Sequence, residues 1–429
     1  MLLIAVAVVG LFFPQRESLG LDSRQSTPGF KRQLVILNTE TRSLDRASVV
    51  MKRVLGFSVS TNTIERICLE VGADLSAAEQ TQWATILQGE VPIPQLAIVE
   101  FDGGRIRTRL TDQGAGVHLS GKGWNETKNA IFVSATSETS EVDPAPDPPA
   151  CFLDRKHVAK LTETAMTREK ARLNEADESV DETDKTNLDE VQADKTDSTK
   201  PKHKPQPILR TVISSLKNST EFGAQMKREA DRRKFDSATR KSFVADGLPC
   251  NWTIQQTHFP SYVPVLDFTH AVSYLFTASI LCLGKGDDAW ELYGDWMTKA
   301  WRGKIDQVLA ELDQHQQRIG WPEKESGDDD PREQLRLAIG YLTNNRQRMK
   351  YDEYRRQGLP TTSAWMESTV KQINYRVKGT EMFWNNPAGA EAILQLRSAA
   401  LSADDRLVRF LTNRPGQAKL KRSAAAQAA

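Results

Sequence analysis

The spacing of apolar and polar residues divides the chain into helical and strand-forming stretches. Residues 30–90 carry apolar residues at helical spacing. Over PQLAIVEFDGGRIRTRL, residues 94–110, an apolar run reaches Asp-Gly-Gly, and Arg then alternates with other residues. This pattern predicts a hairpin in which a Gly-Gly turn joins two strands. Three further strands are predicted: NAIFVSAT (129–136), SFVADG (242–247) and YVPVLDFTH (262–270).

Helical patterns dominate the second half of the chain. Before the strand at 242–247, one helix places Phe222, Met226 and Ala230 on a single side. Residues 271–350 are predicted to be wholly helical and contain four tryptophans. SAWMESTVKQINYRVKGTEMFW, residues 363–384, predicts another helix, and a last one is expected near residues 388–412.

A two-helix pattern lies near the N-terminus. The first helix carries Leu44, Ala47, Val50 and Val54 on one face, and Gly56 ends it. Ser60 can cap the next helix, whose apolar face is formed by Ile64, Ile67 and Val71. Two short helices around a tight turn predict a helix-turn-helix, whose second helix presents Asn62 and Arg66 outward to DNA. A plain helical hairpin without a ligand is the alternative.

Two segments fall outside these patterns. Residues 2–13 are apolar but too short to span a bilayer, so a buried strand is favoured over a signal peptide or anchor. Residues 137–208 are crowded with Glu, Asp, Lys and Thr and poor in apolar residues. Because such a segment buries too little surface to offset its ordering entropy, we expect a largely disordered acidic insertion with a short ordered piece near CFLDRKHVAKL.

Composition adds little to this picture. The 57 basic and 56 acidic residues nearly cancel, so total charge does not indicate a nucleic-acid partner. The four cysteines are far apart, which argues against a zinc ribbon or a disulfide framework and fits a reducing cytoplasm.

Three acids are candidates for chemistry. Asp102 and Asp246 each end a predicted strand and precede glycine, and Glu367 lies on a predicted helix. Ligands gather at strand ends, and carboxylates can hold a pair of magnesium ions that clamp a phosphodiester. On its helix, Glu367 shares a face with Lys371, Asn374 and Lys378, whose side chains could follow a DNA backbone. Each acid also has a plain interpretation, as a turn residue or as a surface pair of Glu367 with Lys371.

Five segments together resemble the DDE transposases of bacterial insertion sequences related to the Mutator-like elements. They are EFDGGRIRTR (100–109), GWNETK (123–128), FVADGLPCNW (243–252), VPVLDFTHA (263–271) and GLPTTSAWMESTVKQINYRVKGTEMFW (358–384). The resemblance covers most of residues 15–412 and is weakest across the acidic insertion. Relatives usually have a longer N-terminal region, often with cysteine pairs, which this chain does not contain.

The resemblance implies an α/β fold: an RNase H-like mixed sheet flanked by helices, with an N-terminal helix-turn-helix region and an all-helical insertion before the last catalytic helix. It implies seven segments: the DNA-binding region (1–90), the first half of the core (91–136), the acidic insertion (137–208), the second half of the core (209–270), the helical insertion (271–350), the catalytic and packing helices (351–415) and a flexible tail (416–429).

The same resemblance implies that Asp102, Asp246 and Glu367 are the catalytic and metal-binding residues. Asp267 and His270 resemble an auxiliary D-x-x-H. Asp267 is also a rival for the second catalytic aspartate, and His270 is equally well explained as a hydrogen-bonded core histidine. Arg105, Arg107 and Arg109 are candidate DNA contacts, with a solvated edge strand as the alternative.

The function expected from the resemblance is that of a DNA transposase. Two magnesium ions, for which manganese can substitute, would support cleavage at the element ends and strand transfer into target DNA. Expected partners are DNA and further copies of the chain, with neither a membrane nor a small-molecule substrate, in the cytoplasm at the nucleoid. The alternatives are an RNase H-like structure-specific nuclease without strand transfer, and an inactive transposase remnant that only binds DNA.

Overall fold

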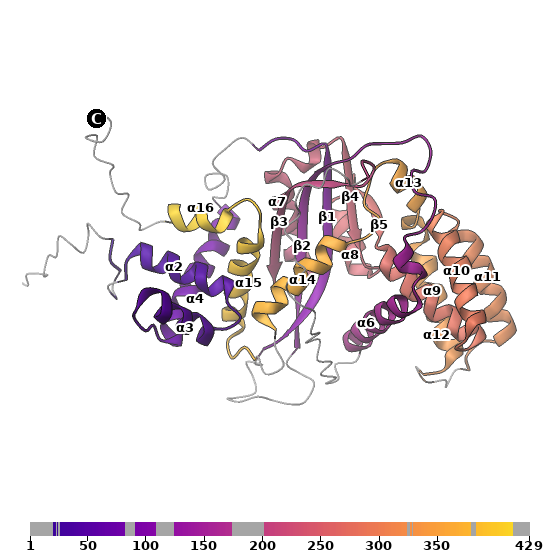
Figure 1. Cartoon of the computed structure of the whole chain (residues 1–429), viewed down its shortest axis with the longest axis horizontal. Helices are drawn as coiled ribbons and strands as arrows, with labels where there is room; N and C mark the ends of the chain where they lie inside the picture. Colours follow the sequence, from indigo (N-terminus) through magenta and orange to yellow (C-terminus); the bar gives the residue numbers. More distant parts are fainter. Residues whose placement is uncertain are drawn as a thin grey trace, which may run out of the picture. The chain divides into compact units, whose positions relative to one another are not determined.

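The computed structural model describes residues 20–22, 24, 26–81, 91–108, 124–173, 201–323, 327, 329–378 and 383–414. The chain divides into two compact units (Figure 1). The smaller unit comprises Met1–Gln88, Glu391–Ala400 and Asp405–Ala429, and the larger unit comprises Gly89–Ala390 and Leu401–Asp404. The apolar N-terminal stretch, Arg109, the acidic run 174–200 and the tail from 416 lie outside the described residues.

The smaller unit is helical and combines the two ends of the described chain. Its helices are α2 (Pro28–Glu40), α3 (Leu44–Leu55), α4 (Thr61–Thr81), the 391–400 part of α15 (Pro387–Leu401), and α16 (Arg406–Asn413). Gly72 of α4 packs directly on Ala392, because a Cβ at position 72 would lie 2.6 Å from the Ala392 carbonyl oxygen. Arg397 donates a 2.7 Å hydrogen bond to the Thr39 carbonyl. The C-terminal segment therefore completes the core of the N-terminal helices.

The expected turn between two helices is present in this unit. Gly56 ends α3 in the left-handed conformation, with φ of 76°, and the Ser60 hydroxyl accepts a hydrogen bond from the Thr63 amide at the start of α4. The expected face of α4, formed by Ile64, Ile67 and Val71, is buried.

The expected face of α3 was partly wrong. Val54 is 71% exposed, and Met51 is buried with Ala47 instead. Met51 and Ala47 are four residues apart and lie one turn from each other on one face of the helix, whereas Val54 falls on the outer side.

The larger unit is built on a five-stranded mixed sheet, with strand order β3-β2-β1-β4-β5. The strands are β1 (Leu96–Arg107), β2 (Trp124–Thr136), β3 (Gln206–Ser215), β4 (Arg240–Ala245) and β5 (Val263–Leu266). β2 pairs antiparallel with both β1 and β3, whereas β4 pairs parallel with both β1 and β5. A mixed α/β unit with this sheet is compatible with an RNase H-like fold.

The Gly-Gly turn predicted after Asp102 was wrong. β1 passes straight through Gly103 and Gly104, and both glycines pair with residues of β2. A Cβ on Gly104 would lie 2.6 Å from the Thr127 hydroxyl oxygen, so the glycine allows the two strands to approach closely rather than to turn. The partner of β1 is the strand predicted at 129–136, which begins earlier, at Trp124.

Helices cover both faces of the sheet (Figure 1). On one face, α7 (Ser219–Arg232) and α8 (Pro249–His258) pack against aromatic side chains of β1 and β4. Phe101 lies 5.9 Å from Phe222 of α7, and Phe243 lies 6.5 Å from Trp252 of α8, between ring centroids. On the other face, α14 (Ala364–Val377) packs against β1 and β2. The alternation of side chains along β1 therefore sends Phe101 toward α7 and its neighbours Glu100 and Asp102 toward α14.

The larger unit has further helices between β2 and β3 and, in greater number, after β5. They are α6 (Arg155–Leu173), which follows the short turn η1 (Ala150–Leu153), α9 (Phe268–Leu283), α10 (Asp287–Trp301), α11 (Ile305–Ile319), α12 (Pro331–Asn345), the turn η4 (Arg346–Arg348) and α13 (Tyr351–Arg356). η1 and α6 contain the ordered piece expected near CFLDRKHVAKL. No described helix is both long and apolar enough to cross a bilayer.

Two expected boundaries were wrong. The strand expected at 262–270 ends at Leu266, because Asp267 caps α9 by accepting a hydrogen bond from the Thr269 amide, and His270 lies in that helix. The single helix expected at 388–412 is two helices, α15 and α16. Asp405, with φ of 54°, interrupts the helical backbone between them.

Candidate active site at the strand ends

Three aspartates directly follow paired positions at one edge of the sheet. Phe101 of β1 pairs with Ala245 of β4, and Ala245 pairs with Leu266 of β5. The next residue along each strand is Asp102, Asp246 and Asp267, respectively. The Asp267 amide donates a 3.0 Å hydrogen bond to the Ala245 carbonyl, which extends the β4–β5 pairing by one step. Asp102, Asp246 and Asp267 are therefore neighbours across three parallel strands.

The polar row continues across the antiparallel strands. Asp102 pairs with Asn129 of β2, and Asn129 pairs with Ser214 of β3. The Ser214 hydroxyl donates a 2.6 Å hydrogen bond to the Asn129 side-chain oxygen, and both residues are buried. A buried amide held by a neighbouring hydroxyl is fixed in orientation, so a rigid, buried polar pair lies beside Asp102.

The two aspartates of the predicted catalytic set are held by local hydrogen bonds. Asp102 is half-buried, and its carboxylate accepts a 2.7 Å hydrogen bond from the Gly103 amide. Asp246 is buried, and its carboxylate accepts hydrogen bonds from the Asn251 side chain and, at 3.3 Å, from the Leu248 amide. Both carboxylates are anchored directly after the point where the parallel pairing of β1 with β4 ends.

Two other carboxylates hold the start of α14. Asp267 is 3% exposed, and its second oxygen accepts a hydrogen bond from the hydroxyl of Ser363, the residue before the helix. Glu100 of β1 accepts a 2.7 Å hydrogen bond from the Met366 amide in the first turn. Side-chain oxygens at a helix N-terminus accept hydrogen bonds from groups that have no partner within the helix. This end of α14 is therefore fixed to β1 and to the end of β5.

Glu100 was not among the residues predicted from the sequence. It is completely buried, and its Oε1 atom has no hydrogen-bond partner. Burial raises the pKa of Glu100 to about 8, and the nearby negative charge of Asp267 adds to the increase. The only signal in the sequence is a single acid inside the apolar run LAIVEF. The raised pKa favours the protonated form of Glu100 at neutral pH.

The third acid of the predicted set is placed differently from the two aspartates. Glu367 directly follows Met366, so its backbone lies in the turn that Glu100 holds. Its side chain is 57% exposed and pairs with the Lys371 ammonium at 3.0 Å, which is the plain surface pair considered from the sequence. Within the described part of the chain, no group of three or more His, Cys, Asp or Glu residues could hold a metal ion as it stands.

The basic candidates in the larger unit lie on β1 and α14. Arg105 and Arg107 are half-buried on one side of β1, with buried Ile106 between them, and the Arg107 guanidinium lies 5.5 Å from the centre of the Trp124 ring. On α14, Asn374 is half-buried, and Lys378 ends the helix as its C-cap residue.

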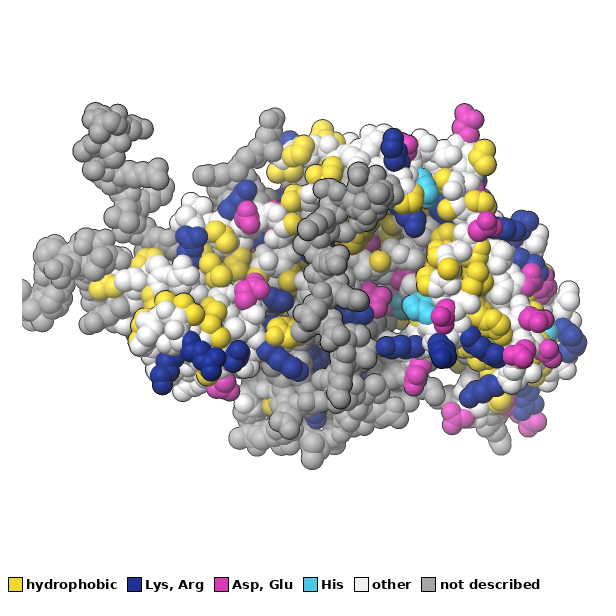
Figure 2. All heavy atoms as spheres, in the orientation of Figure 1, with side chains coloured by type: hydrophobic (Ala, Val, Ile, Leu, Met, Phe, Trp, Pro, Cys, Tyr) yellow, Lys and Arg dark blue, Asp and Glu magenta, His cyan; other side chains and the backbone are white. Residues whose placement is uncertain are grey.

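The remaining candidates lie outside the row of aspartates. Asn62 is exposed on α4, and Arg66 is half-buried with its guanidinium 3.8 Å from Glu70. Figure 2 shows basic side chains gathered over the N-terminal helices. His270 is half-buried in the first turn of α9, close in sequence to Asp267, and its backbone amide donates a 3.1 Å hydrogen bond to the Asp267 carbonyl.

Comparison with known proteins leaves the family open. No protein-family model and no curated protein sequence matches the chain. Among solved structures, the chain is similar to the Drosophila P element transposase strand transfer complex, with 10% sequence identity over 92% of this chain and 94% of that chain and a TM-score of 0.34.

Proposed function

We propose that this chain is a DNA transposase of the DDE type, related to the Mutator-like group, which cuts DNA at the ends of an insertion sequence and joins them to target DNA. The observation that supports this most directly is the adjacency of Asp102 and Asp246, which directly follow the last residues paired between the parallel strands β1 and β4. Two carboxylates at a sheet edge, with a helix carrying a third acid over the same strand, suit the binding of phosphate-bound metal ions.

Magnesium, or manganese in its place, is the cofactor of the proposed reaction. The two aspartates fit such ions by donor type and by position, because Mg²⁺ prefers a few carboxylate oxygens together with water and phosphate. Glu367 would complete the ligand set after exchanging Lys371 for the metal. Two bound ions would supply an activated water or 3′-hydroxyl and would neutralise charge on the phosphodiester.

The residues around these acids have distinct tasks in the proposal. Asn251 holds the Asp246 carboxylate, and the buried Asn129–Ser214 pair lies in the strands beside Asp102. Glu100 and Asp267 fix the start of α14, and hence the turn that carries Glu367. Arg105, Arg107, Lys371, Asn374 and Lys378 would contact DNA phosphates, and Asn62 and Arg66 would contact DNA from α4.

Two alternatives use the same acids or none of them. A structure-specific nuclease would cut DNA at the same carboxylates but would leave nicks without joined strands. A transposase remnant would bind DNA and would not cut it. The reaction products therefore distinguish the three possibilities. The transposase reaction, which joins two element ends, would also require more than one copy of the chain on the DNA.

The test is cleavage of labelled duplexes, taken from the DNA that flanks the gene, by the full-length chain with magnesium. Asp102→Asn and Asp246→Asn should each lower the cleavage rate by at least about 100-fold and leave DNA binding intact, because each removes a metal ligand. Asp313→Asn, on an exposed position of α11, is the matched control and should cut like the wild type. Wild-type cleavage by both aspartate variants would exclude this site.

A further inference from the structure

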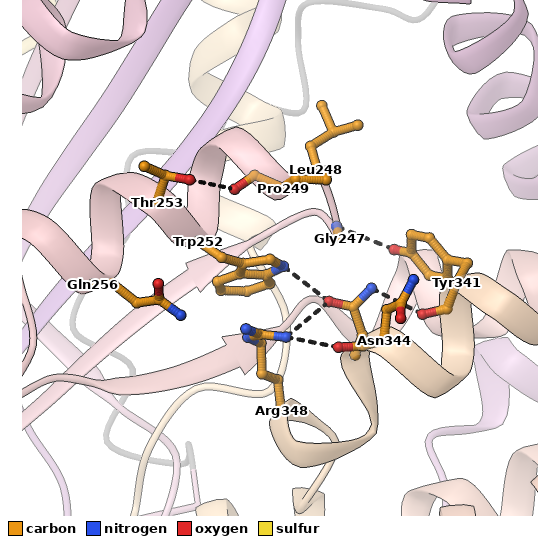
Figure 3. A pocket seen from close by; sticks show the side chains of 10 residues that line it. Gly247, Leu248, Pro249, Trp252, Thr253, Gln256, Tyr341, Asn344 and Arg348 are labelled. Carbon is orange, nitrogen blue, oxygen red and sulfur yellow. Dashed lines mark hydrogen bonds between the residues drawn. The ribbon is translucent and has the colours of Figure 1, made fainter.

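A pocket opens at Gly247, the residue that follows Asp246 in the chain (Figure 3). Its volume is about 450 Å³, which lies within the range of ligand-binding pockets. Trp252, Thr253 and Gln256 line it from α8, and Tyr341 and Arg348 line it from α12 and η4. The pocket therefore combines aromatic rings, amide groups and hydroxyl groups with one guanidinium.

The walls of the pocket are held rigidly. The Gly247 amide donates a 3.1 Å hydrogen bond to the Tyr341 hydroxyl, and the Trp252 indole N–H donates one of 2.9 Å to the Asn345 side chain. Tyr341 is itself stacked on Tyr274, with ring centroids 3.6 Å apart. Side chains fixed in this way keep the cavity open without a bound group.

The pocket carries one uncompensated positive charge. Arg348 is the only charged side chain among the residues that line it. The guanidinium lies 4.4 Å from the centre of the Trp252 ring and donates a 2.9 Å hydrogen bond to the Asn344 carbonyl. Its Nε atom is buried without a hydrogen-bond partner, and no carboxylate of the described residues forms an ion pair with it. Burial lowers the pKa of Arg348, so an anion in the pocket would offset the cost of burying this charge.

We propose that this pocket binds a phosphate-bearing nucleotide of the DNA strand that reaches Asp246. This inference rests on the proposed function, because it assigns a substrate contact beside the same aspartate. Arg348 would hold the phosphate, since a planar guanidinium matches its oxygens. The exposed side chains of Thr253, Gln256 and Asn344 at the rim would contact the sugar and the base. The pocket is larger than a phosphate ion alone would fill, so it has room for the sugar and the base as well.

The test measures binding of a fluorescent single-stranded oligonucleotide to the full-length chain in EDTA, where no metal-dependent cleavage occurs. Gln256→Glu puts a negative charge at the rim and should weaken binding at least about 10-fold. Gln314→Glu makes the same change at an exposed position of α11 and should bind like the wild type. Both are surface substitutions, so folding is preserved in the two proteins that are compared.

Arg348 is tested by the salt dependence of the same binding. Arg348→Gln should lower the slope of log affinity against log salt concentration by about 1, and Arg348→Lys should restore it, because one phosphate contact is lost and regained. A slope unchanged in Arg348→Gln, together with wild-type affinity in Gln256→Glu, would overturn the proposal.

Competition separates the strand from free phosphate compounds. Inorganic phosphate and a nucleoside monophosphate should displace the oligonucleotide only at concentrations far above its own dissociation constant. If either compound displaces the oligonucleotide at a concentration equal to the dissociation constant of the oligonucleotide, the assignment to a DNA strand is overturned. Because the assay contains no metal, its result is independent of whether Asp102→Asn and Asp246→Asn abolish cleavage.

Discussion

The Glu100 carboxylate accepts a 2.7 Å hydrogen bond from the Met366 amide, across 266 positions of sequence. It joins the central strand β1 to the first turn of α14 and places a fully buried acid at the positive end of a helix. Ser363, at the same helix end, donates its hydroxyl to Asp267. Two buried acids outside the proposed catalytic set, Glu100 and Asp267, thus fix the helix turn that carries the backbone of Glu367.

Glu100 should make stability depend on pH. Its pKa is raised from 4.5 to about 8, so the folded state binds more protons than the unfolded state between these values. The stabilising contribution of the protonated form is fully present below about pH 4.5 and is lost as pH rises through about 8. Glu100→Gln keeps an acceptor for the Met366 amide and cannot ionise.

The free energy of unfolding, measured with denaturant at several pH values, should therefore fall less steeply with rising pH in Glu100→Gln than in the wild type. Glu126→Gln, at an acid whose side chain is 46% exposed on β2, is the control and should follow the wild type. Identical pH profiles for wild type and Glu100→Gln would show that Glu100 ionises at its ordinary pKa.

Local periodicity was sufficient to predict much of the fold. The apolar runs of β1, β2 and β4, and the face of α7 formed by Phe222, Met226 and Ala230, follow from patterns of a few residues. These patterns are local, so each stretch carries its own information. The strands that lead to Asp102 and Asp246 were also found this way, although β1 continues past Asp102 to Arg107 and β4 ends at Ala245.

What the sequence did not predict depends on distant partners. Gly103 and Gly104 carry a typical turn signal, but β2 pairs with them and keeps the strand extended. The burial of Glu100 depends on α14, which is far away in sequence. The exposure of Glu367 depends on which side of α14 packs on the sheet, and a helical pattern alone did not decide this.

Gly247 should be the least replaceable glycine near the site. A Cβ added there would lie 2.3 Å from the Tyr341 ring, which is itself stacked on Tyr274. Gly247→Ala should therefore destabilise the chain by about 1–3 kcal/mol, because the ring has to move. It should also weaken oligonucleotide binding at the pocket.

Gly340→Ala in α12 provides the contrast. A Cβ at position 340 meets nothing within 4 Å, and alanine favours a helix interior by up to about 1 kcal/mol over glycine. Thermal unfolding should show opposite shifts of the melting temperature for the two substitutions. Equal shifts would mean that Tyr341 yields without cost.

The ion pair between Arg355 and Asp143 should be a major stabilising contact of the larger unit. The Arg355 Nε atom donates a 2.8 Å hydrogen bond to Asp143, and the guanidinium lies 4.0 Å from the centre of the Trp301 ring. The two side chains are 5% and 17% exposed. Arg355→Ala should cost about 3 kcal/mol, at the low end for a buried pair, because the half-buried Asp143 carboxylate loses its ion pair and keeps the hydrogen bond from the Ala145 amide.

The exposed pair of Arg336 and Glu333 is the matched control. The Arg336 side chain is 47% exposed, and Arg336→Ala should cost no more than about 1 kcal/mol in the same denaturant titration. Burial alone would raise the pKa of Asp143, but hydrogen bonds from Arg355 and the Ala145 amide lower it below its ordinary value. The contribution of the Arg355 pair is present above the ordinary aspartate pKa and should be lost as pH falls through the lowered one.

The ion pair of Glu367 with Lys371 should weaken magnesium binding in the absence of DNA. If Glu367 completes the proposed magnesium site, the Lys371 ammonium, 3.0 Å away, competes with the metal for its carboxylate. An exposed pair of this spacing is worth a few tenths of a kcal/mol, so Lys371→Met should lower the magnesium concentration needed for half-maximal stabilisation by about twofold. Lys378→Met removes the same charge at the end of α14 and should leave that concentration unchanged.

Asp102→Asn and Glu367→Gln should each weaken or abolish the increase of melting temperature with magnesium. If Glu367→Gln instead responds to magnesium as the wild type does, Glu367 is a surface residue paired with Lys371, and the third metal ligand has to be sought elsewhere, with Asp267 as the nearest acid in the row across the strands.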